Sequence, residues 1–102
     1  MSEDEAVLRC QEGDREAFHY LVEQYKDLLY GTALLMSRNR ALAEEHVQEA
    51  FLSAWRGIRG FRRGYPLKPW LVRILVNAVL ANRRRSSIST DPLDESTQAG
   101  ND

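Results

Sequence analysis

Residues 66–85 read "PLKPWLVRILVNAVLANRRR", a stretch that contains no acidic residue and ends in three consecutive arginines. Its apolar residues recur at intervals of three and four, which predicts an amphipathic helix. Pro69 suits a first helical position, where its missing N–H costs nothing, so we expect the helix to run from about 69 to 84. The residues predicted to face the core are Leu71, Leu75, Ala78 and Val79.

The opposite side of this helix is polar. Trp70, Arg73, Asn77 and Arg84 fall within about a 60° stripe at 100° per residue. A membrane span needs about 20 apolar residues, and Arg73 and Asn77 interrupt this run. Arginine and asparagine are residue types that reach phosphates and base edges, so this stripe predicts contact with nucleic acid. Alternatives stay open: Trp70 could pack in the core, Asn77 could be an idle surface amide, and the arginines could end the helix favourably.

The segments upstream also have helical periodicity. A short helix is expected over 4–11, after which Gly13-Asp14 ends one helix and caps the next. A second helix is expected over 15–37 and, after a break with Asn39 as cap, a third over 41–57. The sequence therefore predicts an all-α fold, a compact bundle of about four helices in one domain, with a flexible polar C-terminal tail.

Charge is distributed unevenly along the chain. Residues 1–50 hold eleven acids and five bases, whereas residues 51–90 hold nine bases and no acid. A basic block of this size usually faces a polyanion. The alternative is that the acidic half of the protein balances it internally.

Residues 58–69, "IRGFRRGYPLKP", contain two glycines and two prolines, so a loop without regular structure is predicted. Cations and aromatic rings alternate along it: Arg59, Phe61, Arg62, Arg63 and Tyr65. Unpaired bases stack on aromatic rings and arginines hold phosphates, which favours binding of single-stranded nucleic acid. Alternatively, Phe61 tucks into the core and the arginines are simply solvated.

The third predicted helix has a second candidate surface. Ala43, Val47, Ala50, Phe51 and Ala54 form its core side, and the far side holds Glu45, Gln48, Glu49 and Leu52, with Trp55 at the flank. An exposed leucine and tryptophan rimmed by acids and an amide suggest a protein-contact patch. A solvated helix face is the alternative.

Catalytic and metal-binding constellations are not apparent. His19 and His46 lack partner ligands at metal spacing and are predicted to be boundary or surface residues, and Cys10 has no obvious base beside it. We therefore expect neither an enzyme nor a metal or cofactor site. A single cysteine and an N-terminus without signal-peptide features favour a cytoplasmic protein.

Three segments together resemble region 2 of bacterial extracytoplasmic-function (ECF) sigma factors: "GDREAFHYLVEQYKDLLYGTALLM", "AEEHVQEAFLSAWRGIRGF" and "LKPWLVRILVNAVLANRRR". The resemblance covers about residues 4–86. It implies a helical domain that takes part in transcription initiation, binds the clamp helices of the RNA polymerase β′ subunit, and captures unpaired non-template bases of the minus-ten promoter element.

The resemblance also implies roles for particular residues. Polymerase contact falls on Glu45, Gln48, Glu49, Leu52 and Trp55, within and after "AEEHVQEAF". DNA contact falls on the basic loop and the helix after it: Arg59, Phe61, Arg62, Arg63, Tyr65, Lys68, Trp70, Arg73, Asn77 and Arg84. An anti-sigma factor is a possible further partner, because many ECF factors are held inactive by one.

The sequence departs from the family in places. Glu45 stands where aspartate is usual, His46 where an apolar residue is usual, and Leu67 where an aromatic is common. Full-length ECF factors continue into region 4, a helix-turn-helix domain, and nothing here resembles it. We therefore expect residues 1–86 to be the region 2 domain, 87–102 to be the start of a disordered linker, and the chain to be a truncated piece.

Two other functions remain open at this point. A helix-turn-helix regulator of double-stranded DNA would need a short turn and an exposed recognition helix, which the long aromatic loop and mostly apolar fourth helix do not favour. A helical protein-interaction adaptor would instead use its basic block to bind an acidic partner.

Overall fold

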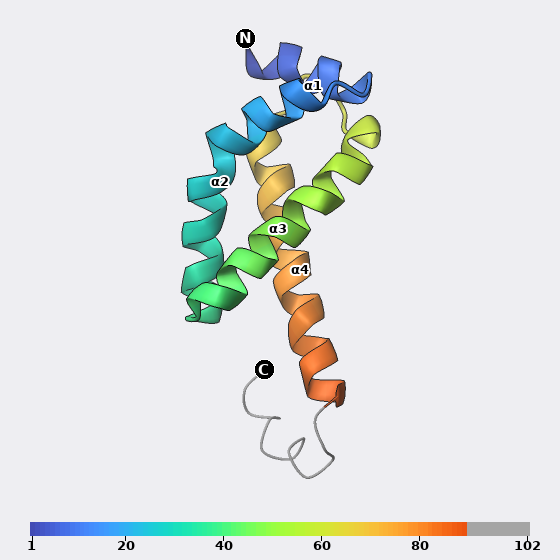
Figure 1. Cartoon of the computed structure of the whole chain (residues 1–102). Helices are drawn as coiled ribbons and strands as arrows, with labels where there is room; N and C mark the ends of the chain where they lie inside the picture. Colours follow the sequence, from blue (N-terminus) through green and yellow to red (C-terminus); the bar gives the residue numbers. More distant parts are fainter. Residues whose placement is uncertain (90–102) are drawn as a thin grey trace.

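The computed structural model describes residues 1–89, and their side chains as far as 85. The helices are α1 (Glu3–Gln11), α2 (Arg15–Ser37), α3 (Arg40–Gly57) and α4 (Leu67–Ser89), with a 3-10 turn η1 (Ile58–Gly60) after α3. Over the described part of the chain there is no strand, which confirms the all-α prediction. Figure 1 shows α3 crossing in front of α4, with α2 beside them and α1 lying across one end of the bundle.

Both predicted helix caps are present. Gly13 adopts a φ of 94°, which favours glycine, and the Asp14 carboxylate then accepts hydrogen bonds from the backbone N–H groups of Glu16 and Ala17. Asn39 caps α3 in the same way by accepting from the N–H of Leu42, 2.9 Å away. These side chains satisfy N–H groups that have no partner within their helices, and so they fix where α2 and α3 begin.

The ends of α4 differ from the prediction. The helix begins at Leu67 and continues to Ser89, so Pro69 lies inside the first turn, where its missing N–H still costs no hydrogen bond. The predicted structureless segment 58–69 is correspondingly shorter, because 58–60 form η1 and 67–69 are helical. Beyond Ser89, the predicted tail lies outside the described residues.

The core lies where all four helices meet, and its largest fully buried side chains include Leu29, Ile58, Leu67 and Leu75. His46 is also buried, at 3% exposure, so the prediction of a boundary or surface residue was wrong. The reason is its spacing, since positions 43, 46 and 50 form a stripe of threes and fours, and Ala43 and Ala50 are buried too. The buried side of α3 is therefore apolar except for the imidazole of His46.

Side-chain hydrogen bonds connect helices that are distant in sequence. The Arg83 guanidinium donates to the carbonyl of Met36 at 2.8 Å, which satisfies a free acceptor in the last turn of α2. In α1, the Glu3 carboxylate accepts from the hydroxyl of Tyr25 in α2. It also accepts from the N–H of Leu67, the first residue of α4, at 3.1 Å. A single carboxylate therefore joins α1, α2 and the start of α4.

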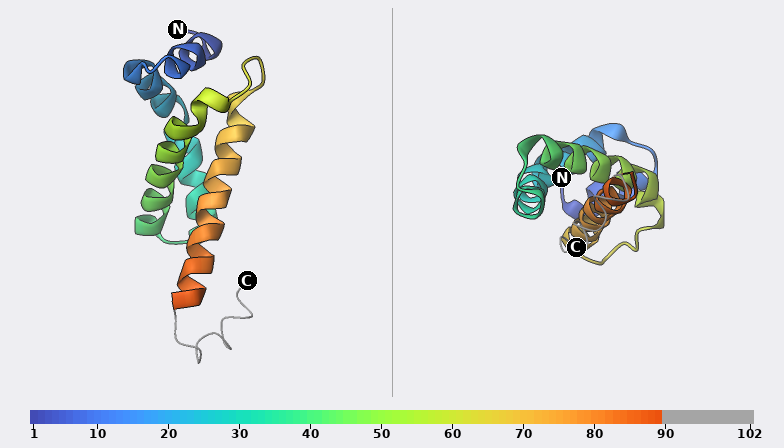
Figure 2. Two further views of the ribbon diagram at one scale, coloured as in Figure 1. Left: turned by 90° about the vertical axis from the view of Figure 1, so that its right-hand side faces the viewer. Right: turned by 90° about the horizontal axis from the view of Figure 1, so that it is seen from below.

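The segment between α3 and α4 lies at the end of the bundle where α1 crosses. Figure 2 shows this segment and α1 together at that end, while the other end of α4 extends past the remaining helices. The basic aromatic segment is thus held between the first helix and the start of the last.

Candidate nucleic-acid and protein interfaces

The segment from 61 to 66 begins with a buried aromatic ring. Phe61 is 9% exposed, and its ring centroid lies 5.1 Å from that of Trp70 on α4. Trp70 itself is half-buried. Aromatic pairs at this separation contribute about 0.5–1.5 kcal/mol beyond the area they bury. Phe61 is therefore part of the core, and Trp70 is the more exposed member of this aromatic pair.

A tight turn follows Phe61. The N–H of Tyr65 lies 3.4 Å from the carbonyl of Arg62, and Gly64 adopts a φ of 95° at the third position of the turn, where glycine is favoured. The Arg62 guanidinium lies over the Tyr65 ring, 5.4 Å from its centroid, and donates to the Tyr65 hydroxyl at 3.3 Å. Arg62 and Tyr65 thus form one exposed unit that presents both a cation and an aromatic surface.

A hollow of about 470 Å³ lies between this turn and the first turns of α4. Five of the predicted DNA-contacting residues line it, namely Phe61, Arg62, Tyr65, Trp70 and Arg73. Gly60, Pro66 and Pro69 also line it, and the sequence reasoning had assigned them only to chain geometry. The hollow therefore combines aromatic surface with two guanidinium groups.

The other five predicted DNA-contacting residues do not line the hollow. Arg59 and Arg63 are exposed at the η1 end, and Lys68 is exposed on the first turn of α4. Asn77 and Arg84 are exposed further along α4, on the same helical side as Arg73. Arg83, which the prediction left out of the DNA-contacting residues, donates instead to the carbonyl of Met36 in α2.

Among the described side chains, no ion pair joins these cations to an acidic residue. Among the described residues, the ion pairs join Arg9 to Glu5 and place His19 and Lys26 beside Glu23, and none involves a residue beyond 50. Exposed, unpaired arginines on one face create a positive potential that attracts a polyanion. The alternative of internal charge balance therefore finds no support in the ion pairs of the described side chains.

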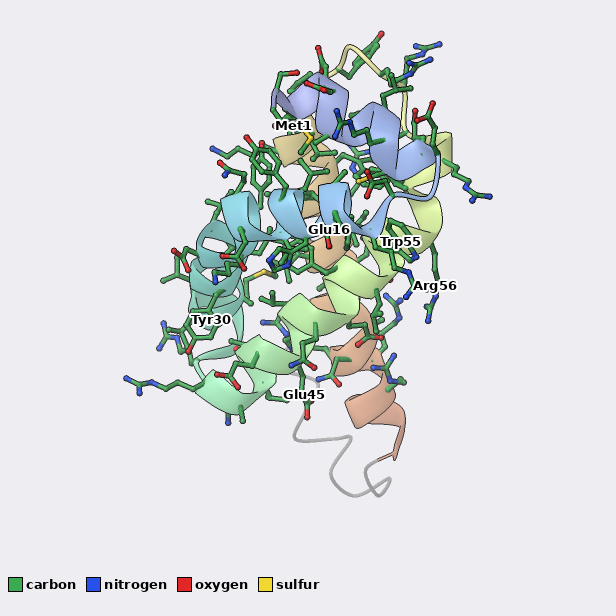
Figure 3. The ribbon with its side chains drawn as sticks, turned by 45° about the horizontal axis from the view of Figure 1, so that its top comes forward. Met1, Glu16, Tyr30, Glu45, Trp55 and Arg56 are labelled. Atoms are coloured by element: carbon green, nitrogen blue, oxygen red, sulfur yellow. The ribbon has the colours of Figure 1, made fainter. Side chains whose placement is uncertain are left out.

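The second candidate face lies on α3. Glu45, Gln48, Glu49 and Leu52 are exposed, Leu52 at 55%, and Trp55 is half-buried. Figure 3 shows Glu45 near the beginning of α3 and Trp55 near its end, next to the first turns of α2.

An apolar groove of about 640 Å³ runs between α2 and α3 on this face. Its walls are Arg15, Phe18, Val22, Gln48, Phe51, Leu52 and Trp55. Phe18 and Trp55 meet at 5.1 Å between ring centroids and so join the two helices. The groove includes three of the five predicted polymerase-contacting residues, whereas Glu45 and Glu49 are not part of its wall.

The α2 side of the groove was missed in the sequence. Phe18 and Val22 belong to the apolar stripe of α2, and a stripe of this kind predicts burial. Both are half-buried, because α3 covers only part of them. A signal was available in principle, because an apolar stripe on one helix and an exposed leucine on the next can form a single surface.

Neither a candidate metal site nor a candidate membrane span occurs among the described residues. Within residues 1–89, no group of three or more histidine, cysteine or acidic residues could hold a metal ion. Over the same range, every helix is too short or too polar to cross a membrane.

Comparisons with known proteins agree on one family. A family model described as Sigma-70 region 2 matches residues 21–88. The ECF RNA polymerase sigma factor SigM of Mycobacterium tuberculosis is 40% identical over 84 residues, which cover 81% of this chain and 43% of that protein. The ECF RNA polymerase sigma-E factor of Escherichia coli K12 is 36% identical over 95 residues, covering 86% of this chain and 48% of that protein. The chain spans less than half the length of these curated relatives.

A solved structure also matches most of the chain. It is an NMR structure of an engineered region 2 of sigmaE in complex with GTAAAA, and its TM-score to this chain is 0.75 at 30% sequence identity. The match covers 83% of this chain and 93% of that one. With the family match, the helical fold and the two interface candidates described above, the chain belongs to the sigma-70 region 2 family, with ECF sigma factors among its relatives.

Proposed function

We propose that this domain acts in transcription initiation by binding core RNA polymerase and capturing unpaired bases of the minus-ten promoter element on the non-template strand. The observation that carries the DNA part is the hollow between the 62–65 turn and α4, with its aromatic rings and arginines, in a stretch of forty residues without an acid. The complex of the sigmaE relative with GTAAAA supports it by analogy.

The energetics favour unpaired DNA. Extruding a base from a duplex costs a few kcal/mol, and stacking on an aromatic side chain returns about 1–3 kcal/mol per base. A hollow bounded by Tyr65 and Trp70 offers such a surface to a single base, and Arg62 and Arg73 beside it offer charge to the phosphates. The domain then stabilises opened DNA, and it performs no covalent chemistry.

The polymerase part uses the groove between α2 and α3. Clamp helices of the β′ subunit would lay an apolar side against Phe18, Leu52 and Trp55, while Glu45 and Glu49 meet basic residues at the rim. A groove with an apolar floor and a charged rim is typical of protein interfaces.

A helix-turn-helix regulator is the less favoured function. The nine residues 58–66 separate α3 from α4. A recognition helix lies with its first turns in the major groove, whereas the first residue of α4, Leu67, is buried and its N–H donates to the Glu3 carboxylate.

Fluorescence anisotropy tests the DNA part. A single-stranded GTAAAA-containing oligonucleotide and its duplex are titrated at the same salt concentration, because affinities of this kind depend on salt. We expect tighter binding of the single strand. Equal or tighter binding of the duplex would sink the proposal and favour the helix-turn-helix regulator; no binding of either would favour the adaptor.

Co-purification with core RNA polymerase tests the protein part. The double variant Glu45→Lys, Leu52→Arg should lose polymerase. Leu35→Arg is a matched control, because Leu35 is 81% exposed on α2 and does not line the groove. Unchanged recovery of polymerase with the double variant would contradict the proposal that the groove binds core RNA polymerase.

A further inference from the structure

The carboxamide of Gln11, the last residue of α1, reaches the segment that follows α3. Its Nε2 donates to the carbonyl of Ile58 at 2.9 Å and to the carbonyl of Phe61 at 2.8 Å. A primary amide has two N–H donors, and here both are used on one short piece of backbone. The two acceptors bracket η1, which is itself closed by a hydrogen bond from the N–H of Phe61 to the carbonyl of Ile58 at 3.0 Å.

The far end of the same segment is also bound to α1. The Glu3 carboxylate accepts from the N–H of Leu67, where α4 begins, at 3.1 Å. Residues 62–66 lie between these two attachments and are all exposed. The turn that carries Arg62 and Tyr65 therefore has both of its ends fixed by side chains of one helix.

This helix lies outside the matched family segment, which begins at residue 21. It contributes no side chain to the hollow. Its side-chain hydrogen bonds next to the hollow are to the carbonyls of Ile58 and Phe61 and to the N–H of Leu67. A contribution of α1 to DNA binding would therefore be indirect, by setting the shape of the turn.

We propose that α1 holds the 61–66 segment in its binding shape before DNA arrives, with Gln11 as the principal positioning residue. This inference rests on the proposed capture of unpaired bases in the hollow. Phe61 both accepts from Gln11 and packs on Trp70, so the hydrogen bond determines where one wall of the hollow lies. A segment ordered in advance loses less conformational entropy on binding, and affinity rises accordingly.

The test replaces the amide without changing charge. Gln11→Met keeps an unbranched side chain of similar length and removes both donors, so Ile58 and Phe61 lose a partner. The Ile58 carbonyl keeps the N–H of Phe61, whereas the partly buried Phe61 carbonyl loses its donor, which corresponds to about a tenfold loss in affinity for the single-stranded GTAAAA-containing oligonucleotide. The slope of log affinity against log salt should stay as in the wild type, because no phosphate contact is removed.

The matched control is Gln24→Met, the same replacement at an exposed position on α2. It should bind as the wild type does. Amide hydrogen exchange supplies a second readout, in which Gln11→Met should speed exchange at Phe61 and Tyr65 and leave the centres of α2 and α3 unchanged. A general loss of stability would instead speed exchange everywhere.

A third variant gives a pH signature. The side chain of Gln11→Glu has the same shape, but at neutral pH its carboxylate faces two carbonyls without a donor. Near pH 4.5 a large share is protonated and can donate one hydrogen bond, so affinity relative to the wild type at the same pH should partly recover. A purely steric effect would not depend on pH.

The outcomes separate the two proposals. Wild-type affinity and unchanged exchange in Gln11→Met would overturn the inference and leave the proposed function standing. Absence of oligonucleotide binding by the wild type would overturn the proposed function and the inference with it. If Gln11→Met fails to fold, Gln11→Asn replaces it, since its amide is one methylene too short, and wild-type binding by that variant would likewise overturn the inference.

Discussion

The rings of Phe61 and Trp70 lie 5.1 Å apart with their planes tilted by 57°, and they join the middle of the α3–α4 connection to the fourth residue of α4. Phe61 is buried and Tyr65, four residues later, is 55% exposed. The core alternative that the sequence left open for Phe61 is therefore confirmed, and the two aromatic residues have different surroundings. One stabilises the wall of the hollow, and the other has a face available to a ligand.

We expect replacement of Phe61 to lower the stability of the domain and replacement of Tyr65 to weaken DNA binding. Phe61→Ala removes a buried ring and should lower the free energy of unfolding by about 3 kcal/mol, as large-to-small core replacements do. Tyr65→Ala should leave stability within about 0.5 kcal/mol, and it should weaken binding of the single-stranded oligonucleotide by about 1–3 kcal/mol, the value of one stacked base. Urea denaturation and anisotropy measure the two effects. A Tyr65→Ala variant that binds normally would exclude stacking on this ring.

Asp14 should be worth about 1 kcal/mol to the folded domain, because its carboxylate satisfies two N–H groups at the start of α2. Asp14→Ala should shift the urea midpoint by a corresponding amount without changing the slope of the transition. Asp27→Ala is the control, since Asp27 is exposed in the middle of the same helix. Equal destabilisation by both variants would mean that general charge, and not capping, is responsible.

Much of this fold could be predicted from neighbouring residues in the sequence, because the helix caps bond backbone groups only two or three residues away. The caps are Asp14 and Asn39, so the beginnings of α2 and α3 could be read from the sequence to within a residue. The exposed side of α4 at Arg73 and Asn77 followed from helical spacing in the same way.

Long-range contacts account for what was missed. The first residue of α4, Leu67, donates to Glu3, which is 64 residues away in the sequence. Arg83 donates to the carbonyl of Met36 at the end of α2, 47 residues away. No local pattern contains such pairings. His46 is different, because its spacing indicated burial and only its residue type argued for the surface.

Alkaline pH should destabilise the domain through the thiol of the buried Cys10 and the hydroxyl of the half-buried Tyr25. Burial, with Asp14 nearby, raises the pKa of the Cys10 thiol from 9.0 to about 11. Burial and the hydrogen bond to Glu3 raise the pKa of the Tyr25 hydroxyl from 10.0 to about 12. Both groups prefer the protonated form in the folded state, so their contribution is complete below pH 9 and is lost as pH rises from 9 to 12.

Thermal melts across this pH range check the effect. The wild-type Tm should fall as pH rises above 9, and the double variant Cys10→Ala, Tyr25→Phe should fall less steeply over the same interval. Each variant is compared with its own Tm at pH 8, because the replacements also remove packing and the hydrogen bond to Glu3. Parallel curves for the two proteins would contradict the assignment.

The consecutive arginines should separate into one structural residue and one that contacts DNA. Arg83 donates to the carbonyl of Met36, whereas Arg84 is exposed on the side of α4 that carries Arg73 and Asn77. If Arg84 holds a phosphate, Arg84→Ala should reduce the slope of log affinity against log salt by about 0.7, the value for one phosphate of a single strand. Arg83→Ala should leave that slope unchanged and lower the free energy of unfolding by about 1 kcal/mol, because a carbonyl at the end of α2 loses its partner. The two variants remove the same charge from adjacent positions, so each is the other's control. An equal change of slope in both would mean that net charge alone, without a specific phosphate contact, governs binding at this end of the helix.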